Sequence, residues 1–225
     1  MISRIRFSGF ILMLVLIHAC KKETDNVSKV IDGSGNVYVD AVLIGTQEWM
    51  AENLKTNKYS NGDEIGTTTQ DISSEGTPRY QWAYGGDESN VATYGRLYTW
   101  YAVTDSRNVC PSGWHVPTDD DWTTLITFLG GEDAAGGKLK EAGTDHWLTL
   151  NVGATNELNF NALPGGFRFS TGNFGYLGNR GFWWTSVEDT MSRGYYRYMA
   201  GIFGFVGRDI TNKQYGFSVR CIKDK

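Results

Sequence analysis

The clearest hydrophobic pattern in the chain is a helical one that ends before Gly130-Gly131. Apolar residues recur there at positions i, i+3, i+4 and i+7, which places them on one helix face; they are Trp122, Leu125, Ile126 and Leu129. Thr118 is a typical N-cap, and three aspartates fill the first turn, where the helix dipole favours them. We predict an amphipathic helix over residues 118–129, and we assign the aspartates to its N-terminus rather than to a metal site.

A second helical pattern covers residues 94–104. Its apolar positions can form one stripe along a helix; they are Leu97, Trp100, Tyr101, Ala102 and Val103. The sequence therefore predicts two main helices, both in the middle of the chain.

The C-terminal third has the pattern of strands instead. Short runs of aromatic and β-branched residues are separated by turn residues, as in an antiparallel meander; the runs lie at 182–185, 195–199, 202–206 and 216–222. In the last run Phe217, Val219 and Cys221 alternate with polar residues, so we expect them to share one apolar face. Near the other end of the chain, a turn at 32–36 predicts a hairpin between residues 30–31 and 37–39.

The first twenty residues have the order of an export signal. Arg4 and Arg6 precede the apolar run 10–17, which is too short to span a membrane permanently. The segment that follows, 16–20, resembles a bacterial lipoprotein signal, in which Cys20 is acylated and becomes the new N-terminus. An ordinary secretory signal with an incidental cysteine is the alternative.

The chain thus divides into three expected parts. These are a lipoprotein signal peptide at 1–19, a polar lipidated tether at 20–29 and a single folded domain at 30–225. We expect the protein to be exported and held at the outer membrane by its N-terminal lipid, where it can face the cell surface.

Composition agrees with a loop-rich, β-containing domain. The chain has 8 Trp, 12 Tyr, 11 Phe and 28 Gly in 225 residues, and this glycine share is well above the roughly 7% of average proteins. A formal net charge of −4, without a long basic run, argues against nucleic acid as a partner. A hydrophobic share of 40% argues against disorder.

The cysteine count fits an exported protein. With Cys20 taken by lipid, Cys110 and Cys221 remain, and two cysteines in an oxidising compartment can pair. Two buried free thiols are the alternative.

The sequence contains no recognisable catalytic constellation. Apart from one histidine in the signal, it has only His115 and His146, and it lacks the motifs of zinc proteases, α/β-hydrolases and phosphate-binding loops. Acidic pairs such as Glu132-Asp133 and Glu188-Asp189 are typical of exposed turns. We therefore expect no enzyme activity, no metal and no cofactor.

Aromatic residues near the C-terminus suggest a binding surface instead. Flat rings with polar neighbours suit sugar rings, whose apolar faces stack on them. The candidates for ligand binding are Trp183, Trp184, Tyr195, Tyr196 and Tyr198. The alternative is that alternate members of this set form the core.

Eight segments between residues 33 and 223 carry distinctive motifs. They are GNVY at 35–38, GTQEWMAENL at 45–54, YGRLYTWYAV at 94–103, CPSGWHVPT at 110–118, GGKLK at 136–140, LPGGFR at 163–168, WWTS at 183–186 and GFSVRC at 216–221. Together and in this order they resemble the Fibrobacter succinogenes major paralogous domain family.

The resemblance implies an α+β domain of C-type lectin-like architecture, related to the formylglycine-generating, sulfatase-modifying fold. Such a domain has two main helices, short and mainly antiparallel strands and long ordered loops. The resemblance also implies a Cys110–Cys221 disulfide between a helical region and the last strand. Family members are typically exported proteins of the Bacteroidetes–Fibrobacteres lineage, many of them lipoproteins, with no settled molecular activity.

The chemistry of the related groups does not follow from the resemblance. Sulfatase modifiers use a cysteine pair late in the chain, whereas only Cys221 lies late here. The Glu-Pro-Asn, Gln-Pro-Asp and Trp-Asn-Asp motifs of calcium-dependent lectins are absent from the sequence. We therefore expect an envelope lipoprotein with a non-catalytic domain that binds glycan or another surface component. The alternatives are a diverged enzyme related to the sulfatase modifiers and a purely structural envelope protein.

Overall fold

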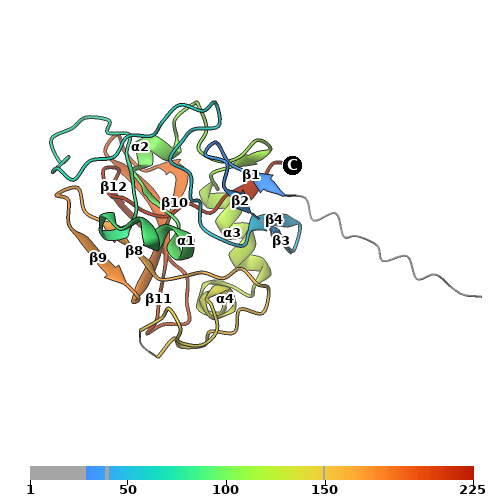
Figure 1. Ribbon diagram of the computed structural model, residues 1–225. Helices are drawn as coiled ribbons and strands as arrows, with labels where there is room; N and C mark the ends of the chain where they lie inside the picture. The colour runs from blue at the N-terminus through green and yellow to red at the C-terminus, as the bar shows by residue number, and fades with distance from the viewer. Residues whose placement is uncertain (1–28, 39–40, 149) are drawn as a thin grey trace, which may run out of the picture.

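The computed structural model describes residues 29–38, 41–148 and 150–225 (Figure 1). The structure is mostly β, with 31% of residues in strands and 16% in helices. The described strands form four sheets, of two, five, four and two strands. The predicted α+β domain, with the C-type lectin-like arrangement of two main helices, is therefore wrong. None of the described helices has the length and apolar character needed to span a membrane.

The largest sheet has five strands in the order β12-β11-β10-β8-β9. Its members are β8 (Gly165–Arg168), β9 (Phe174–Leu177), β10 (Arg180–Glu188), β11 (Arg193–Ala200) and β12 (Gly207–Asn212). Strands β8 and β10 pair in parallel, and the other neighbours pair antiparallel. The strands predicted at 182–185 and 195–199 are confirmed as parts of β10 and β11.

The prediction of a strand at 202–206 is wrong, because backbone carbonyls of this segment accept hydrogen bonds from Gly137 and Lys140 instead of from a neighbouring strand. The carbonyl of Gly204 accepts a hydrogen bond from the Gly137 amide at 2.8 Å. The fully buried Lys140 ammonium donates to the carbonyls of Val152, Ala200 and Phe203 at 3.0, 3.1 and 2.7 Å. Burial also lowers the pKa of Lys140 to about 8. These bonds fold the segment into a turn that leads into β12.

A four-stranded sheet joins distant parts of the chain in the order β3-β4-β13-β7. Its members are β3 (Ala41–Ile44), β4 (Gln47–Met50), β7 (Trp114–His115) and β13 (Ile222–Lys223). Phe217, Val219 and Cys221 are buried together as predicted, but only the end of the predicted strand 216–222 is regular. Arg220 is buried too, so the polar positions of this run do not face solvent.

Two small hairpins complete the β structure. The first pairs β1 (Val30–Ile31) with β2 (Val37–Tyr38), which confirms the predicted hairpin up to the described residues. The second pairs β5 (Gln81–Trp82) with β6 (Leu97–Tyr98).

The helix predicted over 118–129 is confirmed as α3 (Asp119–Phe128). The Thr118 side chain accepts from the Asp121 amide, and the Asp121 side chain accepts from the Thr118 amide, which makes a capping box. A further helix, α4 (Glu132–Leu139), was not predicted. A Cβ atom at Gly136 would lie 2.3 Å from the Phe205 carbonyl oxygen, so this helix needs its glycines for close packing.

The helix predicted over 94–104 is wrong. The chain forms the 3-10 turns Tyr84–Gly86 and Glu88–Asn90, then α1 (Val91–Tyr94), β6 and α2 (Trp100–Val103). Gly95 stops α1 with a φ of 73°. Tyr98 then exchanges backbone hydrogen bonds with Phe217 at 2.8 and 3.0 Å, so the apolar stripe is buried by strand pairing rather than by a helix.

The two faces of the five-stranded sheet have different neighbours. Helices α3 and α4 cover one face and lie to the right of this sheet in Figure 1. Trp183 and Met199 point toward these helices and pack in one core. Phe182 and Trp184 point to the opposite face and pack in a second core with Phe217. The part of this second face farthest from the helices stays open.

Candidate functional site

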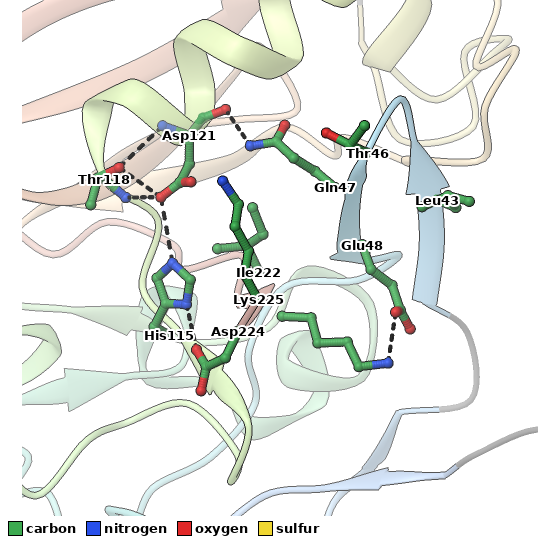
Figure 2. Close-up of a pocket in the computed structure, with 11 residues that line it drawn as sticks. Leu43, Thr46, Gln47, Glu48, His115, Thr118, Asp121, Ile222, Asp224 and Lys225 are labelled. Carbon is green, nitrogen blue, oxygen red and sulfur yellow. Dashed lines mark hydrogen bonds and ion pairs between the residues drawn. The ribbon is translucent and has the colours of Figure 1, made fainter.

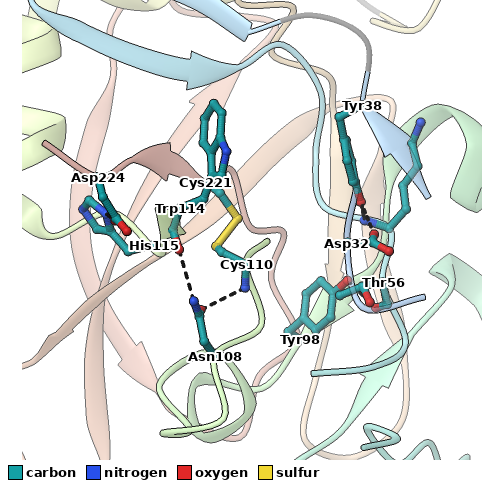
Figure 3. Close-up of a disulfide and its surroundings, with 11 residues drawn as sticks. Asp32, Tyr38, Thr56, Tyr98, Asn108, Cys110, Trp114, His115, Cys221 and Asp224 are labelled. Carbon is teal, nitrogen blue, oxygen red and sulfur yellow. Dashed lines mark hydrogen bonds and ion pairs between the residues drawn. A yellow bond between two sulfur atoms is a disulfide. The ribbon is translucent and has the colours of Figure 1, made fainter. Parts of the chain in front are cut away.

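The Cys110–Cys221 disulfide, which the family resemblance implied, is present (Figure 3). It joins residues 111 positions apart, and both cysteines are fully buried. The Asn108 side chain holds the adjacent loop, because it accepts from the Cys110 amide at 3.0 Å and donates to the Trp114 carbonyl at 3.1 Å. This bond connects the middle of the chain to the end of the four-stranded sheet.

A buried polar network centres on the Asn53 side chain. Its Oδ1 accepts from Trp183 Nε1 at 2.9 Å and from Arg220 Nε and Nη2 at 3.1 and 2.8 Å. Arg220 also donates to the carbonyls of Met50 and Asn161, both at 3.2 Å, and to that of Phe160. Burial lowers the pKa of Arg220 to about 9. All these partners are neutral, so the network stabilises the fold through hydrogen bonds to a buried cation.

The largest pocket, about 460 Å³, lies between β3, β4 and the start of α3 (Figure 2). His115 lies between two carboxylates, with Nδ1 2.6 Å from Asp224 Oδ1 and Nε2 3.4 Å from Asp121 Oδ2 (Figure 2). Burial opposes ionisation of Asp121, but hydrogen bonds from Thr118 and His115 outweigh it and lower its pKa.

Most of the charged side chains that line this pocket pair with one another. Lys223 bonds to Glu48 at 2.7 Å, and Gln47 donates to the Asp121 carbonyl at 3.0 Å. In the part of the chain that the structure describes, no group of three or more His, Cys, Asp or Glu side chains is placed to hold a metal ion. The pocket therefore combines a helix cap with ion pairs that hold most of its charged side chains.

A second cavity, of about 200 Å³, lies on the open face of the five-stranded sheet. We call it the aromatic cleft. Seven of its lining residues are aromatic and the other two are polar: Phe167, Phe169, Tyr176, Phe182, Tyr196, Tyr215, Phe217, Arg180 and Thr211.

Two tyrosines of the aromatic cleft are nearly parallel to the same phenylalanine. The rings of Tyr176 and Phe167 have centroids 5.6 Å apart and an angle of 13° between their planes. The rings of Tyr215 and Phe167 have centroids 5.7 Å apart and an angle of 18°. Phe167 is 7% exposed and forms the floor, whereas Tyr176 is 46% exposed. The cleft therefore presents flat ring surfaces to solvent.

The backbone of Tyr176 is strained. Its φ is 66°, and among the described residues other than glycine it is the only non-asparagine with a positive φ. Such a conformation costs about 1–3 kcal/mol, and strain of this kind concentrates at functional sites. The surrounding structure holds this strain and keeps a large aromatic ring at the surface, where glycine, which has no Cβ atom, would avoid the cost.

Polar groups border the aromatic cleft. The Arg180 guanidinium lies 5.0 Å from the centre of the Tyr176 ring. Burial, together with the nearby Asp209 carboxylate, raises the pKa of Tyr196, so its hydroxyl stays protonated. With Thr211, these side chains offer hydrogen-bond donors and acceptors at the edges of an aromatic surface.

The sequence model of one protein family, the Fibrobacter succinogenes major domain, matches residues 42–223 of the chain. The chain belongs to this family. No curated protein and no solved structure matches it. The major domain begins in β3 and ends in β13, so both ends of the matched region lie in the four-stranded sheet. The aromatic cleft and the disulfide lie within the matched region.

The five predicted ligand-binding residues of this major-domain protein lie in different places. Trp183 and Trp184 are both 0% exposed, so they belong to the two cores and cannot meet a ligand. Tyr195 does not line the aromatic cleft; its ring lies under Arg208 at 4.0 Å and its hydroxyl donates to Asp189.

Two of the five lie on the open face of the sheet. Tyr196 lines the aromatic cleft, and Tyr198 lies next to it at a centroid distance of 6.1 Å. Cys20, the predicted lipidation site, lies outside the described residues.

The sequence analysis missed Tyr176, Arg180 and Tyr215. Tyr176 and Arg180 flank the turn between β9 and β10, and the glycines at 172, 175 and 178 around them were the available hairpin signal. Tyr215 lies two positions before Phe217 and continues the alternation of Phe217, Val219 and Cys221, which was the available signal for it. The backbone strain at Tyr176 has no sequence signal.

Proposed function

We propose that this major-domain protein is a non-catalytic carbohydrate-binding protein, exported and held by an N-terminal lipid at the outer membrane. The strained, solvent-facing Tyr176 in the aromatic cleft is the observation that carries the binding proposal. Sugar rings have apolar faces and hydroxyl edges, and they need flat aromatic surfaces with polar groups alongside. Tyr176 and Tyr215 supply the surfaces, and Arg180 and Thr211 supply the polar groups.

The disulfide supports a binding protein over the enzyme alternative. A diverged sulfatase modifier would need a reactive thiol, whereas Cys110, in the middle of the chain, and Cys221, near its end, are bonded to each other in a fully buried position.

Substitution of the cleft tyrosines tests the binding proposal. We expect Tyr176→Ala and Tyr215→Ala to weaken binding of the glycans that score on a glycan array at least tenfold, about 1.4 kcal/mol, because each removes a stacking surface. Isothermal titration with the strongest array hit measures the change.

The matched control for these variants is Tyr195→Ala. It removes a half-buried tyrosine of the same sheet whose side chain does not line the aromatic cleft. We expect unchanged affinity for this variant. An empty array, or equal effects of Tyr195→Ala and Tyr176→Ala, would contradict the proposal.

The lipid anchor has its own test. We expect Cys20→Ala to move the protein from the membrane fraction to the soluble fraction, because acylation of that cysteine is the proposed attachment. Fractionation and immunoblotting measure the distribution, with Met191→Ala, at a residue 92% exposed, as a control that leaves both the anchor and the disulfide in place. Full membrane retention of Cys20→Ala would refute the anchor and leave the binding proposal in place.

A further inference from the structure

We propose that the aromatic cleft is one end of a longer track that binds several consecutive sugar units of a polymeric glycan. This inference rests on the proposed carbohydrate binding. It concerns four aromatic residues, which we call the aromatic track: Tyr196 of the cleft, Tyr198 on β11, and Phe205 and Phe203 in the turn before β12.

The rings of the track follow one another without a gap. Tyr196, which lines the cleft, has its centroid 6.1 Å from that of Tyr198. Tyr198 lies 6.1 Å from Phe205 with 79° between the planes, an edge-to-face contact, and Phe205 lies 4.9 Å from Phe203 with 26° between the planes. The track therefore runs from the cleft along β11 to the turn before β12.

Tyr198 lies flat on the sheet because its partner across the strands is a glycine. Tyr198 pairs with Gly207 of β12. A Cβ atom at position 207 would lie 2.2 Å from Cε1 and Cζ of the Tyr198 ring, so a larger residue would push the ring away. A tyrosine covering a glycine on the neighbouring strand stabilises the sheet, and here it also turns a ring face outward.

The far end of the track is open to solvent. Phe203 is 41% exposed, and Phe205 and Tyr198 are half-buried. Asp209 on β12 pairs with Tyr196 on β11, so a polar side chain lies beside the rings. A chain of sugar units needs this combination of repeated ring faces and polar edges, because each unit has two apolar faces and a rim of hydroxyls.

The size of the cleft favours a polymer over a single small molecule. Pockets that enclose a small ligand are about 300–1,000 Å³, whereas the aromatic cleft is about 200 Å³ and shallow. One sugar unit would therefore bury little surface. Affinity must come from neighbouring units in contact with neighbouring rings, as in other multi-contact interactions.

A series of oligosaccharides of increasing length tests the track. The probes are cello-, xylo-, malto- and chito-oligosaccharides from disaccharide to hexasaccharide, titrated against the soluble domain. We expect affinity for the recognised series to rise at least tenfold with length. Tyr198→Ala and Phe203→Ser should remove this rise and leave the disaccharide affinity unchanged, whereas Tyr195→Ala should change neither.

Gly207→Ala gives an independent variant that keeps every aromatic residue. Its new methyl group should displace the Tyr198 ring and weaken hexasaccharide binding to the level of Tyr198→Ala. Circular dichroism and thermal melting check that each variant is folded, and a hexasaccharide affinity equal to wild type in folded Gly207→Ala would overturn the role of that ring.

The outcomes separate the track from the cleft. Affinity that is independent of length, with Tyr176→Ala still damaging, would overturn the track and keep the proposed function. Absence of glycan binding by the wild-type protein would overturn both the track and the proposed function. Binding to phosphatidylethanolamine–phosphatidylglycerol vesicles that Phe203→Ser abolishes, without any length dependence for glycans, would assign the exposed end to a lipid surface and also overturn the track.

Discussion

The double variant Cys110→Ala/Cys221→Ala should lose about 4–5 kcal/mol of the free energy of unfolding, because the bond closes a long loop in the unfolded chain. The loop spans 111 positions, and the cross-link removes much of the conformational entropy that the unfolded state would otherwise gain. The two cysteines also tie the segment before β7 to the segment before β13, which are neighbours in one sheet. Without the bond, the end of the chain is still held by β13 and by backbone hydrogen bonds of residues 217–221 to Met50, Leu54, Tyr98 and Trp184, so the loss comes mainly from the unfolded state.

Urea denaturation followed by tryptophan fluorescence measures this loss. The wild type under dithiothreitol should fall to the stability of the double variant, since both lack the same constraint. Met191→Ala, at a residue 92% exposed, is the control for substitution without structural consequence. A loss below about 1 kcal/mol, outside the range for removal of a native disulfide, would contradict the expected role.

Replacement of Asn53 by leucine is expected to cost about 3–5 kcal/mol, because it removes two hydrogen bonds to a buried cation, each worth about 1.5–3 kcal/mol, and one to the Trp183 indole N–H. Leucine has a similar volume but no acceptor, so Arg220 loses two hydrogen bonds and Trp183 loses one. Arg220 is 1% exposed, so water cannot replace these bonds. The cationic guanidinium would remain buried with backbone carbonyls as its partners.

Two further variants make this measurement specific. Asn53→Asp keeps an acceptor oxygen and adds a charge opposite to that of Arg220, so it should lose less stability than Asn53→Leu. Asn57→Leu changes an exposed asparagine in the same segment and should stay within about 0.5 kcal/mol of wild type. Equal losses for Asn53→Leu and Asn53→Asp would show that the acceptor is not what Asn53 contributes.

Both predictions concern residues within the motif segments that carried the family resemblance. Asn53, Trp183 and Arg220 lie in three separate segments, and the structure brings them into one buried network. Cys110 and Cys221 lie in two such segments and form one bond. These motifs hold the fold together, and the aromatic cleft uses other positions, such as Tyr176 and Tyr215, that lie outside them.

Local sequence patterns predict α3 correctly, but they do not predict the structure of residues 94–104. The capping box at Thr118 and the apolar spacing that follows it act within about three turns of chain, so the sequence predicts α3 correctly. Residues 97–103 offer a similar apolar stripe, but hydrogen bonds from Tyr98 to Phe217 compete with a helix there. That partner lies more than a hundred positions away, and a local pattern carries no signal for it.

The amino-acid sequence by itself determined the family, the capped helix, the first hairpin, the two longest strands and an aromatic-rich C-terminal region. Tertiary structure decided which aromatic residues reach solvent. Trp183 and Trp184 are adjacent on β10 and point to opposite faces, yet packing buries both, one beneath the helices and one beneath Phe217. Tyr176 reaches the surface because β8 and β10 fix its neighbours and hold its backbone at a positive φ. The physical reason is that alternation along a strand sets which face a side chain takes, whereas the elements packed against that face set whether it stays open.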